Sequence, residues 1–383
     1  MAQAAKPSPW MALTSAALTL PAFSASVPDQ VEIGISTTAY RESDQNPQSV
    51  LVGSVQRYDI NINQFYLITP IGRDWGLALD LSHESMSGAS PWGTVSVVGA
   101  NTQLVMSGAT IEEARNELSL GITRYFDTAS LGFSVTRSEE NDYIATAMAV
   151  NGEWDFNNRQ STLAAGLSYS TDSIEPSDAL SFGRTLKQAR RSASFSLAWT
   201  QVLNRASVLQ SGFSVTQHNG YLSDPYKLRD IRPRQRLETA INFRYRRFMH
   251  RSDSSLHLDY RYYHDDFGIG SHTLRSAWYQ NLTDQFQLIP SVRYYSQNQA
   301  DFYVGGDDYG LPETVFQSSD YRLSGFGAVT FGLQGRFSQR DWSVSVNFER
   351  YLSAAGYGLN ASRAEHPGLL RFSLLSFGFD VKL

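Results

Sequence analysis

The densest polar stretch of the sequence lies at 260–273 and places two histidines and two aspartates close together. Imidazole and carboxylate groups are suitable ligands for a divalent cation, so one interpretation is a metal site. The other is a solvated turn in which Asp and Gly shape the backbone, and we favour it. We therefore predict a polar hairpin without a metal, containing His264, Asp265, Asp266 and His272.

Three further motifs begin like functional sites and are incomplete. His83-Glu84 opens like a zinc-protease motif, but Ser87 stands where the second histidine is needed. Gly166 to Ser170 lacks the second glycine of a nucleophile elbow and lies within an alternating, strand-like segment. Gly305 to Asp308 lacks the spaced ligands of a calcium loop. We predict no catalytic residue, no enzyme activity, no cofactor and no metal.

The composition restricts the class of protein further. The 383 residues include no cysteine, which excludes disulfides, thiolate metal sites and an amino-terminal lipidated cysteine. The net charge of −5 gives no reason to expect nucleic acid as a partner. No segment after the amino-terminal region approaches the ~18 consecutive apolar residues that a transmembrane helix needs. The lack of such a segment does not exclude transmembrane strands, because only alternate residues of a strand contact lipid.

Alternation of apolar and polar residues runs through the chain from Val31 onward. It predicts sixteen strands of about ten or more residues, the length that a tilted strand needs to cross a bilayer. The predicted strands are 31–41, 57–69, 75–86, 113–126, 130–138, 143–156, 160–171, 190–202, 206–217, 235–247, 255–264, 270–280, 285–297, 320–337, 341–352 and 370–383. The fold class is therefore all-β: a transmembrane, antiparallel, up-and-down β-barrel of about 16 strands.

Connection lengths predict the orientation of this barrel. Connections after even-numbered strands are short, such as Asp127–Ala129, and those after odd-numbered strands are mostly long, such as Asn298–Ser319. Outer-membrane barrels have short periplasmic turns and long extracellular loops, so the 264–272 hairpin falls on the extracellular side. Tryptophans near the short turns fit an interfacial aromatic girdle. They are Trp75, Trp154, Trp199, Trp278 and Trp342.

The same alternation predicts which side chains face lipid and which face the lumen. Leu77, Leu79 and Leu81 should face lipid, while Ala78, Asp80 and Ser82 face the lumen. In the last predicted strand Phe377 and Phe379 alternate with polar residues, as expected of a closing strand that faces lipid. The predicted lumen-lining charges are Asp80, Glu238, Arg244, Arg246, Asp259, Arg261, Arg293, Arg322 and Glu349.

The amino terminus resembles a secretory signal, with Lys6 before an apolar run from Trp10 to Leu20 and small residues near Ser24. We predict a signal peptide at 1–26 and an outer-membrane β-barrel at 27–383. The expected partners are outer-membrane lipid and the barrel assembly machinery, and the expected location is the bacterial outer membrane.

Several stretches together resemble a family of unknown function. They are 220–227, 260–273, 293–303 and 319–323. The family consists of predicted outer-membrane β-barrels of Gram-negative bacteria, and the similarity covers nearly all of the chain after the signal. The resemblance implies genes for a small lipoprotein, a thioredoxin-like protein and a flavin transferase nearby, and a role in an envelope redox or transport system.

Three functions follow from these features. We favour a pore or conduit of unknown substrate, with selectivity set by the lumenal charges. The alternative is a structural sheath for a small periplasmic or lipoprotein redox partner in an envelope electron-transfer system. An outer-membrane enzyme is the third and least favoured function.

Overall fold

The computed structural model describes residues 27–96, 102–108, 111–360 and 364–383. The predicted signal peptide at 1–26 lies outside the described residues. Sixteen long strands form one closed antiparallel barrel, as the alternation predicted. In chain order they are β1 (Glu32–Glu42), β3 (Asp59–Ile71), β4 (Trp75–Gly88), β7 (Ile111–Tyr125), β8 (Ala129–Glu139), β9 (Tyr143–Phe156), β10 (Ser161–Ile174), β11 (Gln188–Asn204), β12 (Ser207–Gly220), β14 (Gln235–Met249), β15 (Ser254–Asp265), β16 (Gly270–Asn281), β17 (Phe286–Gln297), β19 (Phe326–Ser338), β20 (Trp342–Ala354) and β21 (Arg371–Lys382).

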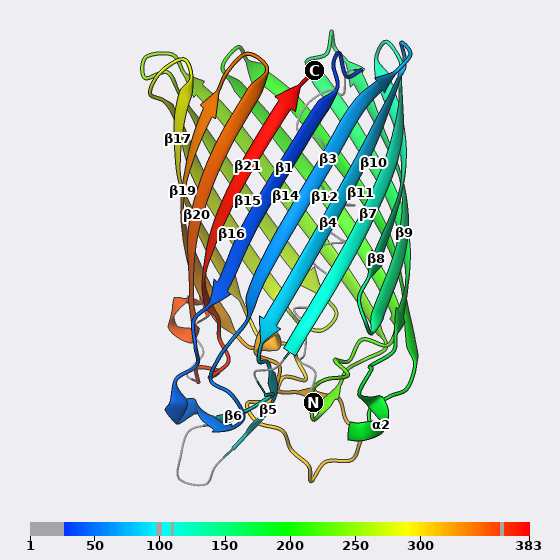
Figure 1. Cartoon of the computed structure of the whole chain (residues 1–383), viewed down its shortest axis with the longest axis vertical. Helices are drawn as coiled ribbons and strands as arrows, with labels where there is room; N and C mark the ends of the chain where they lie inside the picture. The colour runs from blue at the N-terminus through cyan, green and yellow to red at the C-terminus, as the bar shows by residue number, and fades with distance from the viewer. Residues whose placement is uncertain (1–26, 97–101, 109–110, 361–363) are drawn as a thin grey trace.

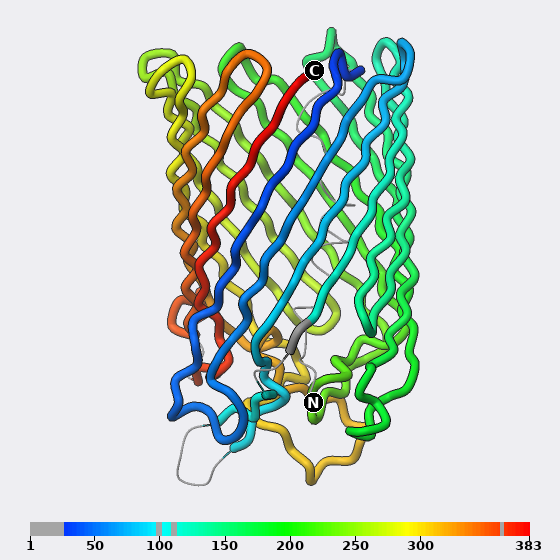
Figure 2. The backbone as a smooth tube through the Cα atoms, viewed as in Figure 1, coloured from blue at the N-terminus to red at the C-terminus, as the bar shows by residue number. Residues whose placement is uncertain are grey.

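The last strand closes the cylinder by pairing with the first (Figure 2). Ile35 of β1 lies opposite Phe379, and Thr37 lies opposite Phe377. Directly opposite residues of an antiparallel pair share one face of the sheet. Ile35 and Phe377 are exposed apolar side chains, so this face is the outer surface of the barrel.

The five tryptophans near the short turns also lie on the outer face, because they continue the alternation of exposed apolar residues. Trp75, Trp154, Trp199 and Trp342 are all more than a third exposed. They lie near the strand ends that the short turns join, and this end of the barrel is uppermost in Figure 1. This is the arrangement expected of an interfacial girdle, where amphipathic rings sit at headgroup depth.

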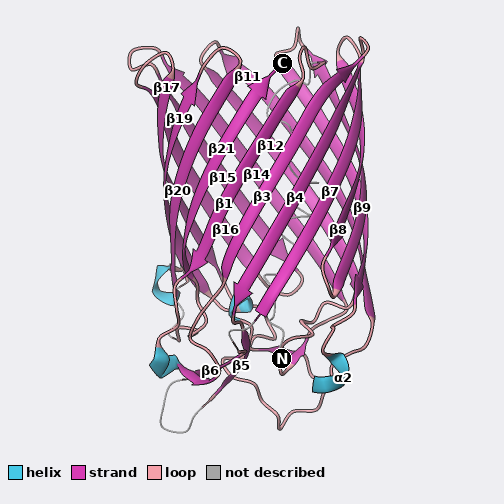
Figure 3. Ribbon diagram, viewed as in Figure 1, coloured by secondary structure: helices cyan, strands magenta, loops and turns pink. Residues whose placement is uncertain are grey.

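The opposite end of the barrel carries the long connections and all of the small elements (Figure 3). β2 (Val50–Val52), β5 (Pro91–Val95) and β6 (Gln103–Met106) form a three-stranded sheet, and β13 (Asp230–Ile231) pairs with β18 (Gln317–Ser318). The helical turns are η1 (Pro47–Ser49), α2 (Ala179–Phe182), η2 (Tyr321–Leu323) and η3 (Ala355–Tyr357). None of the helices that the structure describes is long and apolar enough to cross a membrane.

One predicted strand begins later than expected. The sequence predicts a strand from residue 320, whereas β19 begins at Phe326. The Asp320 side chain accepts a hydrogen bond from the backbone N–H of Arg322 and caps the turn η2. Aspartate at such a position offers the backbone a local hydrogen bond that competes with the sheet. The chain therefore stays in the loop for six more residues.

Candidate functional site

The inner face of the barrel is identified by the exposed apolar residues that alternate with it. Leu79 lies opposite Leu120, and Leu81 lies opposite Leu118. Leu118 and Leu120 are 48% and 50% exposed, which places this set on the outside. Asp80 stands between the two leucines of β4, opposite Ser119, and therefore faces the lumen.

The predicted lumenal charges of the second half of the chain follow the same rule. Glu238, Arg244 and Arg246 alternate with the exposed Ile241 and Phe243 on β14. The other strands repeat this alternation, with exposed Tyr262, Val292 and Phe348 next to the charged positions. The inward positions on these strands are Asp259 and Arg261 on β15, Arg293 on β17 and Glu349 on β20.

Four of these inner positions form one level row across neighbouring strands. Arg244 lies opposite Asp259, Asp259 lies opposite Arg275, and Arg275 lies opposite Arg293. Arg275 was not among the predicted lumenal residues. The same alternation could have found it, because exposed Leu274 precedes it on β16. The row makes β14 to β17 the arginine-rich part of the inner wall.

The arginines of this wall differ in their partners. Arg246 Nη2 lies 2.6 Å from Asp259 Oδ1 in a salt bridge. The Arg261 guanidinium lies 5.7 Å from the centre of the Tyr263 ring, and that of Arg293 lies 5.6 Å from the Tyr295 ring. Both distances are within the range of cation–π attraction. Tyrosine faces thus support guanidinium groups without neutralising their charge.

Arg322 is an exception, and its predicted place on a lumen-lining strand is wrong. It lies in η2, before β19 begins, because Asp320 caps this turn and keeps Arg322 out of the strand. Its guanidinium donates to Asp320 Oδ1 over 2.9 Å and to Asp224 Oδ2 over 2.8 Å. Arg322 therefore joins two loops that are 98 residues apart in sequence.

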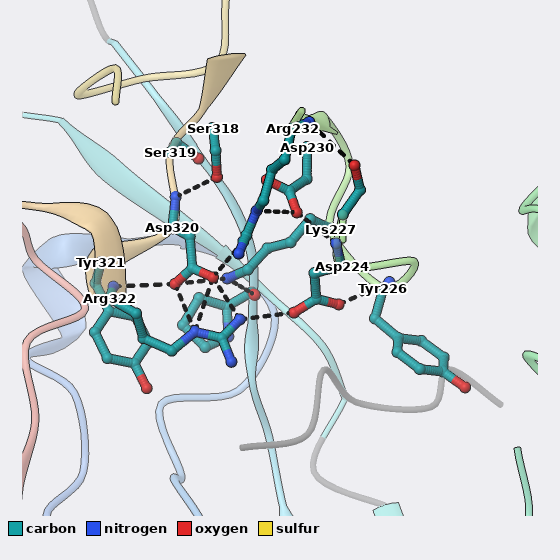
Figure 4. Close-up of polar contacts among 12 residues, drawn as sticks. Asp224, Tyr226, Lys227, Asp230, Arg232, Ser318, Ser319, Asp320, Tyr321 and Arg322 are labelled. Carbon is teal, nitrogen blue, oxygen red and sulfur yellow. Dashed lines mark hydrogen bonds and ion pairs between the residues drawn. The ribbon is translucent and has the colours of Figure 1, made fainter. Parts of the chain in front are cut away.

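Six charged residues form a cluster around Asp320 at the long-loop end (Figure 4). Arg232 donates to Asp230 and to Asp320, both over 2.9 Å. Lys227 Nζ lies 4.0 Å from Asp320 Oδ1 and donates to the carbonyl of Pro91 over 2.8 Å. The six residues, hereafter the charge latch, are Asp224, Lys227, Asp230, Arg232, Asp320 and Arg322. Three cations face three carboxylates, so the latch is neutral.

Electrostatics within the charge latch keep Asp320 ionised. Its carboxylate is fully buried, and burial alone would raise the pKa of an aspartate. The cations Arg322, Lys227 and Arg232 outweigh burial and hold the pKa of Asp320 well below its ordinary value. Burial lowers the pKa of Lys227, and the Asp320 carboxylate opposes that change. The stabilisation from Asp320 is present above its unfolded-state pKa and is lost only as the pH falls through its depressed folded pKa.

Backbone contacts extend the charge latch into a larger assembly of loops. The N–H of Leu228 donates to the carbonyl of Trp92 over 2.7 Å, and the N–H of Asp307 donates to that of Thr94 over 2.7 Å. Arg184 donates to the carbonyl of Pro225 over 2.8 Å. Segments 89–96, 175–187, 221–234 and 298–325 are therefore bonded to one another, and we refer to them as the loop cap.

The polar hairpin forms at the end of β15 and β16, as predicted, and its side chains diverge. Asp265 is buried and accepts hydrogen bonds from the backbone N–H groups of Phe267 and Ile269. His264 is exposed on the other side of the strand, and His272 bonds the Tyr260 hydroxyl over 2.8 Å. Asp266 is exposed in the turn. Among the described residues no three His, Asp or Glu side chains are grouped to hold a metal ion.

Sequence reasoning missed the charge latch as a unit. Its two halves lie in 224–232 and 320–322, within or next to two of the stretches that carry the family resemblance. The signal was the density of charge in 227–232, where four of the six residues are charged, which the strand pattern does not explain. Which charge meets which depends on how two distant loops fold, and alternation along a strand contains no information about that.

Comparison with known proteins agrees with the fold. A solved structure described as a bacterial polysaccharide outer membrane secretin is 10% identical, with 94% of this chain and 100% of that chain covered and a TM-score of 0.52. CdiB from Acinetobacter baumannii is also 10% identical, with 93% and 60% covered and a TM-score of 0.51. At such identity the likeness shows the barrel fold alone. No curated protein matches the chain.

A family model gives the relationship that these structures do not. The model described as "Protein of unknown function (DUF3570)" matches residues 10–362. The matched region includes every strand of the barrel except β21, together with the loop cap. The chain therefore belongs to the DUF3570 family.

Proposed function

We propose that the protein is an outer-membrane conduit for solutes, with its long loops on the extracellular side. The observation that supports this most strongly is a closed barrel of sixteen strands with an apolar outer face and a polar, charged inner face. Apolar residues outward match the hydrocarbon of a bilayer, and closure leaves no unpaired strand edge in lipid. A barrel of this strand number is wide enough for an aqueous channel unless loops or a partner fill it.

The loop cap suggests how access of solutes to the lumen is controlled. Its segments are held together by buried ions and backbone hydrogen bonds at the long-loop end. Separating a buried ion pair has a large free-energy cost, so the cap resists thermal opening. We propose that the cap restricts which solutes reach the lumen.

Single-channel recording tests the conduit directly. The purified, refolded protein is added to a planar bilayer, and folding is checked by the heat-dependent shift of barrel migration on a gel. Stable ohmic steps are expected from the protein alone. A correctly folded barrel that never conducts, with the cap intact or with its latch broken by Asp320→Asn, would refute the proposal.

A second candidate function is a sheath around a small polypeptide, and the inner wall of β8 to β12 favours it. One level row across these five strands consists of small residues. The row is Ser134, Ala149, Ser168, Ser194 and Thr216. Short side chains leave the backbone accessible to a partner that packs against the wall. The small lipoprotein implied by the family resemblance is the partner we propose, and copurification of the two proteins is the test.

A further inference from the structure

Two arginines face each other on the inner wall without a neutralising partner. Arg275 of β16 lies directly opposite Arg293 of β17. Like charges in this position destabilise a sheet. In the part of the chain that the structure describes, neither guanidinium forms a salt bridge with a carboxylate, whereas Arg246 on β14 does. The Tyr295 ring supports the Arg293 guanidinium without neutralising it, so the repulsion between the two charges remains a cost to folding.

The surrounding charges strengthen the local excess. Six arginines and three carboxylates occupy the inner face of β14 to β17, a charge of +3 (6 − 3). Arg236 forms salt bridges with Glu238 and Asp265 at the long-loop end, and the remaining group of five arginines and one aspartate carries a charge of +4 (5 − 1). The residues are Arg244, Arg246, Asp259, Arg261, Arg275 and Arg293. We refer to this group as the arginine panel.

Carboxylates occupy the opposite side of the lumen. In the order of strands around the barrel, β4 lies eight strands from β15 in either direction, which is diametrically opposite. Asp80 and Glu84 lie on the inner face of β4, and Arg115 of β7 pairs with Glu84. An anion in the lumen is therefore attracted to one wall and repelled by the other. In a low-dielectric cylinder such charges concentrate ions of one sign.

We propose that the arginine panel is a binding site for small multivalent oxyanions, such as a di- or tricarboxylate or a phosphorylated metabolite. Neighbouring strands are about 4.8 Å apart, so Arg275 and Arg293 present two guanidinium groups at a spacing that two acidic groups of one small molecule can meet. Guanidinium binds carboxylate and phosphate through paired N–H donors. The inference deepens the proposed conduit by naming what it carries, and it rests on that function for transport but not for binding.

The experiment compares two double variants that remove the same net charge. Arg275→Gln with Arg293→Gln neutralises the centre of the arginine panel. Arg137→Gln with Arg191→Gln neutralises two exposed arginines on the outer face, of β8 and β11. Each changes the net charge from −5 to −7. Arg293→Gln alone replaces the panel variant if the double variant does not reach the folded form on a heat-modified gel.

Two measurements are made on each folded protein. The first is the reversal potential in a salt gradient, which gives the ratio of chloride to potassium permeability. The second is calorimetric titration of the detergent-solubilised barrel with citrate, inorganic pyrophosphate and acetate. The panel variant is expected to lose anion preference and to bind citrate or pyrophosphate at least about tenfold more weakly, because a charge-assisted hydrogen bond contributes about that factor. The outer-face variant should match the wild type, and acetate should bind more weakly than citrate.

The outcomes separate this inference from the proposed function. Two results overturn the anion site while the conduit stands. One is a cation-selective channel, and the other is an affinity for citrate and for pyrophosphate that is the same in the panel variant as in the outer-face variant. A barrel that is silent both with its cap intact and with Asp320→Asn, and that binds citrate or pyrophosphate through the arginine panel, refutes the conduit and supports the site. A barrel that is silent in both forms and binds neither anion refutes both. If citrate and pyrophosphate differ in affinity, the tighter of the two identifies the class of oxyanion.

Discussion

Asp320→Asn tests whether the charge latch holds the loop cap closed. Asp320 is the one carboxylate that contacts all three cations of the latch, Lys227, Arg232 and Arg322. The change keeps the shape of the side chain and removes its charge. The latch then carries three cations and two carboxylates, a net charge of +1 in a buried position.

The magnitude follows from the burial of the group. Removing one partner of a buried ion pair costs about 3–5 kcal/mol, because the remaining charge is left without compensation. Arg232 retains Asp230 and Arg322 retains Asp224, so we take the lower end, about 3 kcal/mol. At 1.36 kcal/mol for each factor of ten, the open population of the cap should rise about 150-fold.

Limited proteolysis with trypsin measures this population. Lys227 and Arg322, which precede Leu228 and Leu323, are cleavage sites within the latch, and cleavage tracks the open fraction when opening and closing are fast. We expect the Asp320→Asn protein to be cut there about 150-fold faster, with the barrel still folded on a heat-modified gel. Glu313→Gln, in an exposed part of the same loop, should be cut at the wild-type rate. Equal rates for the wild type and Asp320→Asn would refute the latch.

Three further predictions test the facing, the closure and the pH dependence of the structure. Leu79→Arg should reduce the yield of folded barrel in lipid by a cost of roughly 2–4 kcal/mol, whereas Asp80→Asn should fold normally; equal yields would contradict the assigned faces. Deleting Phe377–Leu383 should abolish assembly, since these residues pair with both β1 and β20; a heat-modifiable barrel from the truncated chain would contradict this. Burial raises the pKa of Asp307 to about 6, so the folded cap binds its proton more tightly than the unfolded chain, and stability falls as the pH rises from about 4 to about 6. Asp307→Asn should therefore slow hydrogen exchange of 302–318 relative to wild type at pH 7.5 and have little effect at pH 5; the same ratio at both pH values would show that this carboxyl does not titrate in that range.

The sequence predicted the strands well because each one meets two different environments. Lipid and water on opposite faces impose a period of two, and that period is visible in β4 and β20 without any knowledge of their neighbours. The one large boundary error, at β19, arose where an Asp320 side chain replaced a strand with a capped turn. A local hydrogen bond of this kind leaves the alternation of apolar residues almost unchanged, so the alternation does not reveal where the turn replaces the strand.

The functional groups were only partly predictable for a related reason. Facing follows from alternation, so the inward positions of Arg244 and Arg293 could be predicted. The opposition of Arg275 and Arg293 depends on register between strands, which the sequence alone does not supply. The pairing of Asp224 with Arg322 depends on two loops meeting across 98 residues, and no periodicity encodes it.

The position of the charge latch has a mechanical consequence. Asp224 lies in the connection that leads into β14, and Arg322 lies in the connection that follows β17. Their ion pair therefore links the loop before β14 to the loop after β17, the two outer strands of the arginine panel, at the long-loop end of the barrel. Sheets flex when lateral pressure in a membrane changes. Without the ion pair, the distance between β14 and β17 at the long-loop end would change with that pressure. The ion pair therefore opposes a change in the spacing of β14 to β17 at this end of the barrel.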